Sequence, residues 1–165
     1  MESKMLKFIL CLSLLFLNSF SYAGETADYV LVEKSKNLLT LFKNGKSMAS
    51  YYVVFGSNPI GHKQQEGDNR TPEGRYILDT KNAKSSFTKS IHISYPNTAD
   101  IANAKSRGVS PGGAIMIHGQ KNGFGWASVA MQRINWTQGC IALNNEDMEQ
   151  VWRSIVVPTT IEIKP

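Results

Sequence analysis

The feature that most limits what this chain can fold into is a series of short apolar segments separated by turn residues, which starts after Asp28. The first three segments, 29–32, 38–42 and 50–55, are rich in aromatic, β-branched and Leu residues, a composition typical of β-strands. Between the second and third segments, Asn44 and Gly45 both accept a positive φ angle, so they predict a two-residue hairpin turn. The chain is therefore predicted to open with a β-meander.

Later segments alternate strand patterns with two helix patterns. Strands are predicted over 76–79, 90–95, 115–118 and 160–163. Helices are predicted over 97–107 and 145–155, where polar capping residues precede regularly spaced apolar residues. The spacing of Trp126, Val129 and Ala130 is helical, but the Gly residues around it leave 123–135 ambiguous. The pattern as a whole predicts a mainly β fold with a few short helices.

The polar segment 56–75 is long for a connection in a small domain. Its last part contains Pro72, which fixes φ, and Gly74, which permits a turn. These turn residues favour an ordered loop, and we expect this loop to wall a cleft.

The first 23 residues resemble an export signal. Lys4 and Lys7 precede a short apolar run over 8–17, and a region of small and polar residues ends at Ala23. The run is shorter than the roughly 20 apolar residues that span a bilayer as a helix. We expect cleavage after Ala23, with an uncleaved N-terminal anchor as the alternative. Residues 24–165 would then form a single domain without a stable membrane anchor.

Charge and histidine content narrow the classes of partner. The signal carries Glu2, Lys4 and Lys7, so its removal lowers the formal net charge from +5 to +4. The remaining cations are scattered, which argues against a nucleic-acid partner and fits an anionic envelope polymer or membrane surface. None of the three His residues lies at ligand spacing to another His or to Cys140, so no metal site is predicted.

Cys140 is the main candidate for chemistry. Cys11 leaves with the signal, and a lone thiol in an exported chain is either a reactive group or a buried, inert side chain. His118 ends the apolar strand 115–118, so it is a candidate base that would take the thiol proton and leave a thiolate–imidazolium pair. The alternative for His118 is a core histidine with one hydrogen bond.

Other residues near Cys140 suit supporting roles. The backbone N–H groups of Gly139 and Cys140 can stabilise an oxyanion, and the carbonyl of Gly119 can orient His118. Trp136 is a candidate cleft wall. His92 shares the polar face of its strand with Ser94, so it either lines the cleft or is an ordinary surface histidine; His62 lies in a polar loop and is expected to be solvated.

Three motifs together resemble a known family. The stretch TQGCIALNNED over 137–147 resembles the signature of the L,D-transpeptidase catalytic domain, also called the YkuD domain. Ile117-His118-Gly119 resembles the His-Gly element of that family, and TPEGRY over 71–76 resembles its Thr-Pro-x-Gly-x-aromatic loop. With their flanking strands, these elements span 29–163 in the expected order.

The resemblance implies a β-sandwich-like L,D-transpeptidase domain with the nucleophile at the base of a cleft. It implies Cys140 as nucleophile, His118 as general base and acid, the Gly119 carbonyl as the group that orients His118, and no metal or organic cofactor. Thr137 and Gln138 would contact the substrate. Gln138 stands where the family usually has His, Ala142 where it usually has Arg, and the family's His-to-Cys spacing is commonly shorter.

The resemblance implies action on peptidoglycan stem peptides in the periplasm or cell envelope. The Cys140 thiolate would attack the bond between the diamino acid and D-Ala, and the thioester would then pass to an amine. The result is a 3-3 cross-link, attachment of an envelope protein, or D-amino-acid exchange, which are reactions of cell-wall organisation and cell shape. Two alternatives remain: a thiol hydrolase that cleaves stem peptides or protein–peptidoglycan links, and a non-enzymatic wall-binding domain.

Overall fold

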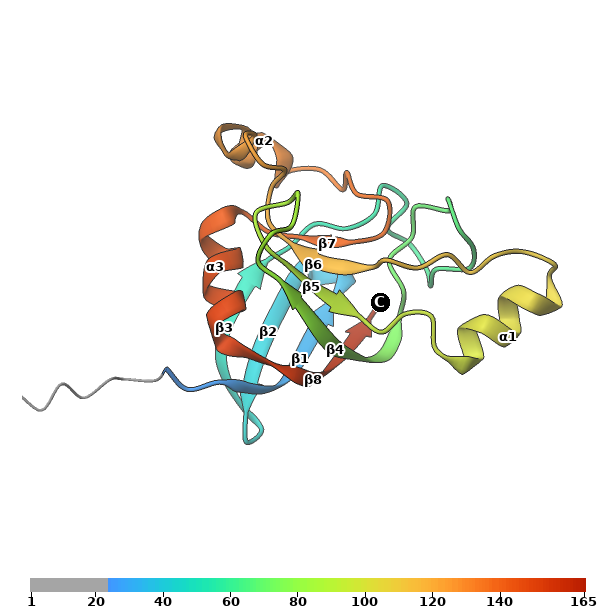
Figure 1. Ribbon diagram of the computed structural model, residues 1–165, viewed down its shortest axis with the longest axis horizontal. Coiled ribbons are helices and arrows are strands. Elements are labelled where there is room, and N and C mark those ends of the chain that lie inside the picture. The colour runs from blue at the N-terminus through green and yellow to red at the C-terminus, as the bar shows by residue number, and fades with distance from the viewer. Residues whose placement is uncertain (1–23) are drawn as a thin grey trace, which may run out of the picture.

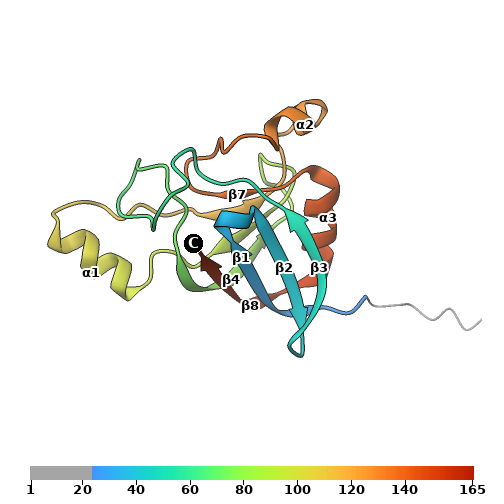
Figure 2. The ribbon, with the colours of Figure 1, turned by 180° about the vertical axis from the view of Figure 1, so that it is seen from behind.

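A computed structural model describes residues 24–165, so the predicted export signal over 1–23 lies outside the described residues. The strands form one eight-stranded sheet in the order β3-β2-β1-β8-β4-β5-β6-β7 (Figure 1, Figure 2). Their bounds are β1 (Ala27–Glu33), β2 (Leu38–Lys43), β3 (Lys46–Tyr52), β4 (Gly74–Asn82), β5 (Ser90–Ile93), β6 (Met116–His118), β7 (Ile141–Ala142) and β8 (Ile155–Lys164). The mainly β fold predicted from the sequence is confirmed.

The predicted meander is present, with one change at its third strand. Asn44 and Gly45 have φ angles of 50° and 74°, as the hairpin between β2 and β3 requires. Strand β3 covers 46–52 rather than 50–55, because the chain leaves the β2 edge after Tyr52. Val54 instead exchanges both backbone hydrogen bonds with Ala142, at 2.8 and 3.0 Å. This bridge joins the two ends of the sheet and curls it.

Strand β8 connects the two halves of the sheet. It pairs parallel to β1 and antiparallel to β4, so the C-terminal strand lies between elements from the first half of the chain. The register with β1 shifts between the Ala27 and Tyr29 pairs, and Pro158, which cannot donate a backbone hydrogen bond, lies in that irregular part of β8. The strand is longer than the predicted 160–163.

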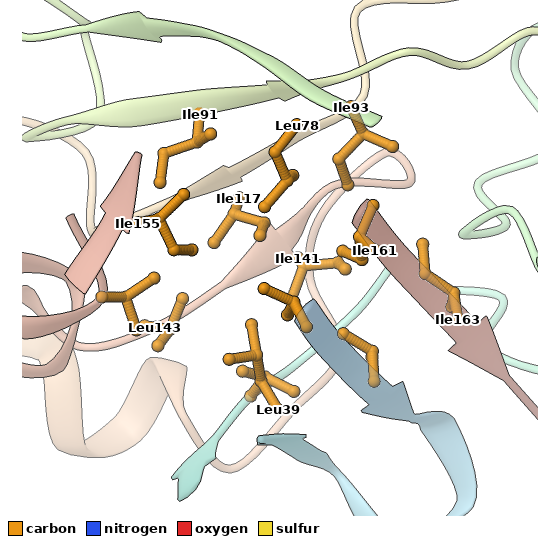
Figure 3. Close-up of a cluster of buried hydrophobic side chains, with 14 of the residues drawn as sticks. Leu39, Leu78, Ile91, Ile93, Ile117, Ile141, Leu143, Ile155, Ile161 and Ile163 are labelled. Atoms are coloured by element: carbon orange, nitrogen blue, oxygen red, sulfur yellow. The ribbon is translucent and has the colours of Figure 1, made fainter. Parts of the chain in front are cut away.

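The core lies inside the curl. Leu39 from β2, Ile91 from β5, Ile141 from β7 and Ile161 from β8 are fully buried in one cluster (Figure 3). Because one sheet faces itself across this cluster, the fold has the two packed layers of the expected sandwich-like domain.

The helices lie outside the sheet. They are η1 (Lys34–Lys36), α1 (Thr98–Ser106), η2 (Gly125–Ala127), α2 (Ser128–Met131) and α3 (Asn145–Ser154). The predicted helices 97–107 and 145–155 are confirmed as α1, capped by the Asn97 side chain, and α3, capped by Asn144. The ambiguous segment 123–135 forms only the short η2 and α2. None of the helices in residues 24–165 is long and apolar enough to cross a membrane.

Candidate active site

Two neighbouring strands bring Cys140 and His118 together. Strands β6 and β7 run parallel, with Ile117 opposite Ile141 and His118 opposite Ala142. Successive side chains of a strand alternate between its faces, so Cys140, one residue before β7, projects on the same face as Ala142 and His118. Cys140 and His118 both line one cavity of about 640 Å³. The tertiary structure thus places the two candidate residues, which are 22 positions apart in the sequence, around the same cavity.

His118 is buried and held in one tautomer. Its Nδ1 lies 2.7 Å from the Gly119 carbonyl oxygen, and because a carbonyl only accepts, Nδ1 carries the proton. A neutral ring then keeps its lone pair on Nε2. Burial lowers the pKa of His118, and the hydrogen bond to Gly119 opposes this effect. His118 is only 4% exposed, and it therefore favours the neutral form that can accept a proton.

The Cys140 thiol also favours its neutral form. Its Sγ lies 3.6 Å from the Ala114 carbonyl oxygen. Burial raises the pKa of Cys140, while a backbone hydrogen bond from Met116 and the charge of Lys63 lower it. With the pKa of His118 lowered as well, burial opposes charge on both side chains of the predicted thiolate–imidazolium pair.

The turn that precedes the thiol requires glycine. Gly139 has a φ of +128°, and a Cβ there would lie 2.7 Å from the Arg70 carbonyl oxygen. The Gly139 N–H donates to Thr137 Oγ1 at 3.1 Å, and this hydroxyl donates to the Cys140 carbonyl at 2.7 Å.

This arrangement changes two expectations. The Gly139 N–H, expected to stabilise an oxyanion, is already bonded to the Thr137 hydroxyl. No carbonyl or side chain in the described part of the chain accepts the Cys140 N–H, which leaves it as the available donor of the two. Thr137, expected to contact the substrate, lines the cavity but uses its hydroxyl to brace the turn.

The remaining predicted contacts divide into two groups. Trp136 and Gln138 line the cavity, and the Trp136 indole nitrogen is buried without a hydrogen-bond partner in residues 24–165. His92 lies on the same sheet face, opposite Met116 on β6, but does not line the cavity. Its Nδ1 lies 2.8 Å from an Asp79 carboxylate oxygen instead. Of the two alternatives given for His92, this geometry fits the surface histidine.

One wall of the cavity was not predicted from the sequence. The β4–β5 connection supplies Lys84, Ser85, Ser86 and Phe87. The Phe87 ring centroid lies 4.6 Å from that of His118. In the sequence, a connection rich in Ser and Lys resembles an ordinary solvated loop. Only its position after β4 in the folded chain identifies it as a wall of the cavity.

Cys140 and Gln138 also border a second cavity of about 220 Å³. Lys63, Glu66 and Gly67 from the 56–73 loop line this side, which confirms the expectation that the loop walls a cleft.

His62, in the same loop, was expected to be solvated, but its ring nitrogens contact protein groups. Its Nδ1 accepts the Glu73 N–H at 2.9 Å, and its Nε2 lies 3.0 Å from an Asp100 carboxylate oxygen. In the part of the chain that the structure describes, no group of three or more His, Cys, Asp or Glu side chains is placed to hold a metal ion.

Comparison with known proteins agrees with this geometry. A family model described as the L,D-transpeptidase catalytic domain, YkuD, matches residues 27–163. YafK of Escherichia coli strain K12, which carries a provisional L,D-transpeptidase name, is 28% identical over 133 residues, or 77% of this chain and 46% of YafK.

Solved structures give the same fold. The helical cell shape determining protein Pgp2 from Campylobacter jejuni has a TM-score of 0.62 at 25% identity, over 88% of this chain and 54% of that chain. Bd1075 from Bdellovibrio bacteriovorus has a TM-score of 0.59 at 22% identity, over 84% of this chain and 48% of that chain. The chain spans about half the length of these relatives.

Proposed function

The chain belongs to the L,D-transpeptidase catalytic domain family, and from this premise we propose that it is a cysteine-dependent acyltransferase acting on peptidoglycan stem peptides. The observation that carries the proposal is the placement of Cys140 and a tautomer-fixed His118 on neighbouring strands around one cavity. A nucleophile, a base and a group that orients the base are the components that acyl transfer requires.

The first half of the reaction uses the neutral pair directly. As Sγ attacks the carbonyl of the diamino acid, His118 Nε2 takes the thiol proton, and the Gly119 carbonyl stabilises the imidazolium that forms. The Cys140 N–H donates to the developing oxyanion. The carbon–nitrogen bond then breaks, His118 returns the proton to the amino group of the departing D-Ala, and the acyl group remains on Cys140 as a thioester.

The second half repeats these roles with a new nucleophile. An amine attacks the thioester and His118 takes its proton. The carbon–sulfur bond then breaks, and His118 returns the proton to Sγ, which regenerates the thiol and the neutral imidazole. A stem-peptide amine yields a 3-3 cross-link, an envelope-protein amine yields an attached protein, and a free D-amino acid yields exchange. The Pgp2 similarity supports a role in cell shape for this activity. The export pattern over 1–23 supports action in the periplasm or cell envelope, after cleavage at Ala23.

The test is mass spectrometry of the purified protein incubated with a disaccharide-tetrapeptide, beside Cys140→Ala and His118→Ala. We expect an adduct on Cys140 with loss of D-Ala, followed by a joined product, and neither in Cys140→Ala. Lys46→Ala, at the distant β2–β3 hairpin, is the matched control and is expected to react like the unchanged protein.

Increasing the amine concentration then separates the alternatives. Joined product that rises with amine supports the transferase, whereas hydrolysed product alone at every amine concentration would assign a thiol hydrolase. Failure of both the tetrapeptide and a carbapenem to acylate Cys140 would contradict the proposal and favour a wall-binding domain.

A further inference from the structure

Large apolar side chains are exposed together in one segment, residues 124–134, which we call the apolar projection. Four of the nine exposed large hydrophobic residues among 24–165 lie in it: Phe124 is 48% exposed, Trp126 83%, Val129 73% and Ile134 57%. The other five are spread over separate elements: Tyr52, Ile60, Ile77, Ile101 and Val156. Single exposed apolar residues are ordinary on protein surfaces, whereas a concentration of them marks an interaction surface.

The backbone holds these side chains away from the core. Helices η2 and α2 run from Gly125 to Met131 and stand off the sheet at one end of the molecule (Figure 1, Figure 2). Trp126 and Val129 are three residues apart in this helical turn, so they lie on the same side of it. The 123–135 segment, which was ambiguous in the sequence, therefore exposes its large apolar side chains at the surface.

Cations outnumber carboxylates around the apolar projection. Lys121 and Arg133 flank the apolar side chains in the sequence, and Glu146, at the start of α3, lines a cavity with Val129. The Lys121 ammonium lies 5.6 Å from the centroid of the Phe124 ring. Because two cations face one carboxylate, an anionic surface that also accepts apolar side chains complements the projection.

We propose that the apolar projection docks the protein reversibly on an anionic lipid surface. Trp and Phe suit the boundary between headgroups and acyl chains, where Val129 and Ile134 can also leave water. Lys121 and Arg133 would contact lipid phosphates, and each cation near such a surface contributes about 1 kcal/mol.

Two other occupants fit the surface less well. A glycan strand presents many hydroxyl groups, but Val129 and Ile134 offer no side-chain hydrogen bonds to them. A second copy of the chain, bound about a two-fold axis, would bring Lys121 and Arg133 of both copies towards one another, with only one Glu146 in each copy to offset them.

The test is co-sedimentation of the full chain with vesicles of phosphatidylcholine, with and without about a third phosphatidylglycerol. We expect binding only to the anionic vesicles, weakening as salt rises. Replacing both Trp126 and Val129 with Ser removes two exposed apolar groups and is expected to weaken binding roughly tenfold or more. Lys121→Gln with Arg133→Gln should weaken it too, whereas Ile60→Ser, which alters a side chain that is 80% exposed elsewhere, should not.

Several outcomes would overturn the inference. These are absent binding, equal binding to neutral and anionic vesicles, and equal binding by the Trp126→Ser, Val129→Ser variant. Sedimentation of a dimer that this variant abolishes would assign the surface to a second copy, and pull-down on lipid-free glycan strands would assign it to the wall. Cys140→Ala is expected to bind vesicles normally, so the result is independent of the proposed acyl transfer.

Discussion

Burial raises the pKa of Cys140 and lowers the pKa of His118, so it favours the neutral form of both residues. A buried neutral imidazole remains a competent base, because it takes the proton only while the thiol attacks. Lys63, which lines the second cavity, lowers the pKa of Cys140 through its charge. Its side chain is 3% exposed, and its ammonium donates to the Asp68 carboxylate at 2.8 Å and to the Gln65 carbonyl at 3.1 Å.

Replacing Lys63 with Met tests this electrostatic influence. Because the Lys63 charge lowers the pKa of Cys140, its loss should raise the pH midpoint of Cys140 alkylation by iodoacetamide. Lys63→Arg keeps the charge and should leave the midpoint near its original value. An unchanged midpoint in Lys63→Met, with unfolding measurements showing an intact fold, would contradict this role.

At the scale of elements, the 56–73 loop is ordered by a carboxylate rather than by regular secondary structure. Burial by itself would raise the pKa of Asp68, but hydrogen bonds from Lys63 and from the backbone N–H groups of Gln64, Arg70 and Gln65 lower it to about 2. The same four donors fold the chain around Asp68 and place Lys63 beside the second cavity.

Asp68 in this loop should make the free energy of unfolding depend on pH in the acid range. A carboxyl group with a lowered folded-state pKa stabilises the protein above its unfolded pKa, near 4, and loses that contribution as the pH falls towards 2. We expect Asp68→Asn to remove roughly 1 to 2 kcal/mol of this pH-dependent stability. Urea unfolding between pH 6 and pH 2.5 measures it. Glu66→Gln, which changes an exposed carboxylate of the same loop, is the control. An equal pH slope in both variants would contradict the assignment to Asp68.

At the scale of the whole molecule, stability depends on contacts between segments far apart in the chain. Ile141 follows Cys140, pairs with Ile117 and is fully buried in the core that both halves of the sheet share. The short strand β7, which directly follows the proposed nucleophile, is therefore also a core strand.

Truncating Ile141 should destabilise the entire fold. Ile141→Ala leaves a cavity and is expected to cost roughly 2 to 5 kcal/mol in the free energy of unfolding, measured in urea. Ile77→Ala removes the same atoms from a side chain that is 39% exposed, and should cost less than about 1 kcal/mol. Equal losses at both positions would contradict a shared core through β7.

Local patterns determined much of this protein. The Asn44–Gly45 turn, the capped helices α1 and α3, and the candidacy of Cys140 and His118 all follow from residues that act on their near neighbours. These features are readable because turns, caps and periodic apolar faces depend on a few consecutive residues.

Long-range pairing decided the rest. The position of β8 between β1 and β4, the Val54–Ala142 bridge, and the separation of His92 from the cavity depend on which distant strands meet. The exposure of Trp126 was also decided by tertiary structure, because its helical spacing is compatible with a buried face as well as with a surface one. A sequence pattern shows that a side chain belongs to a face, but only the tertiary structure shows what that face contacts, because burial is a property of the whole packed chain.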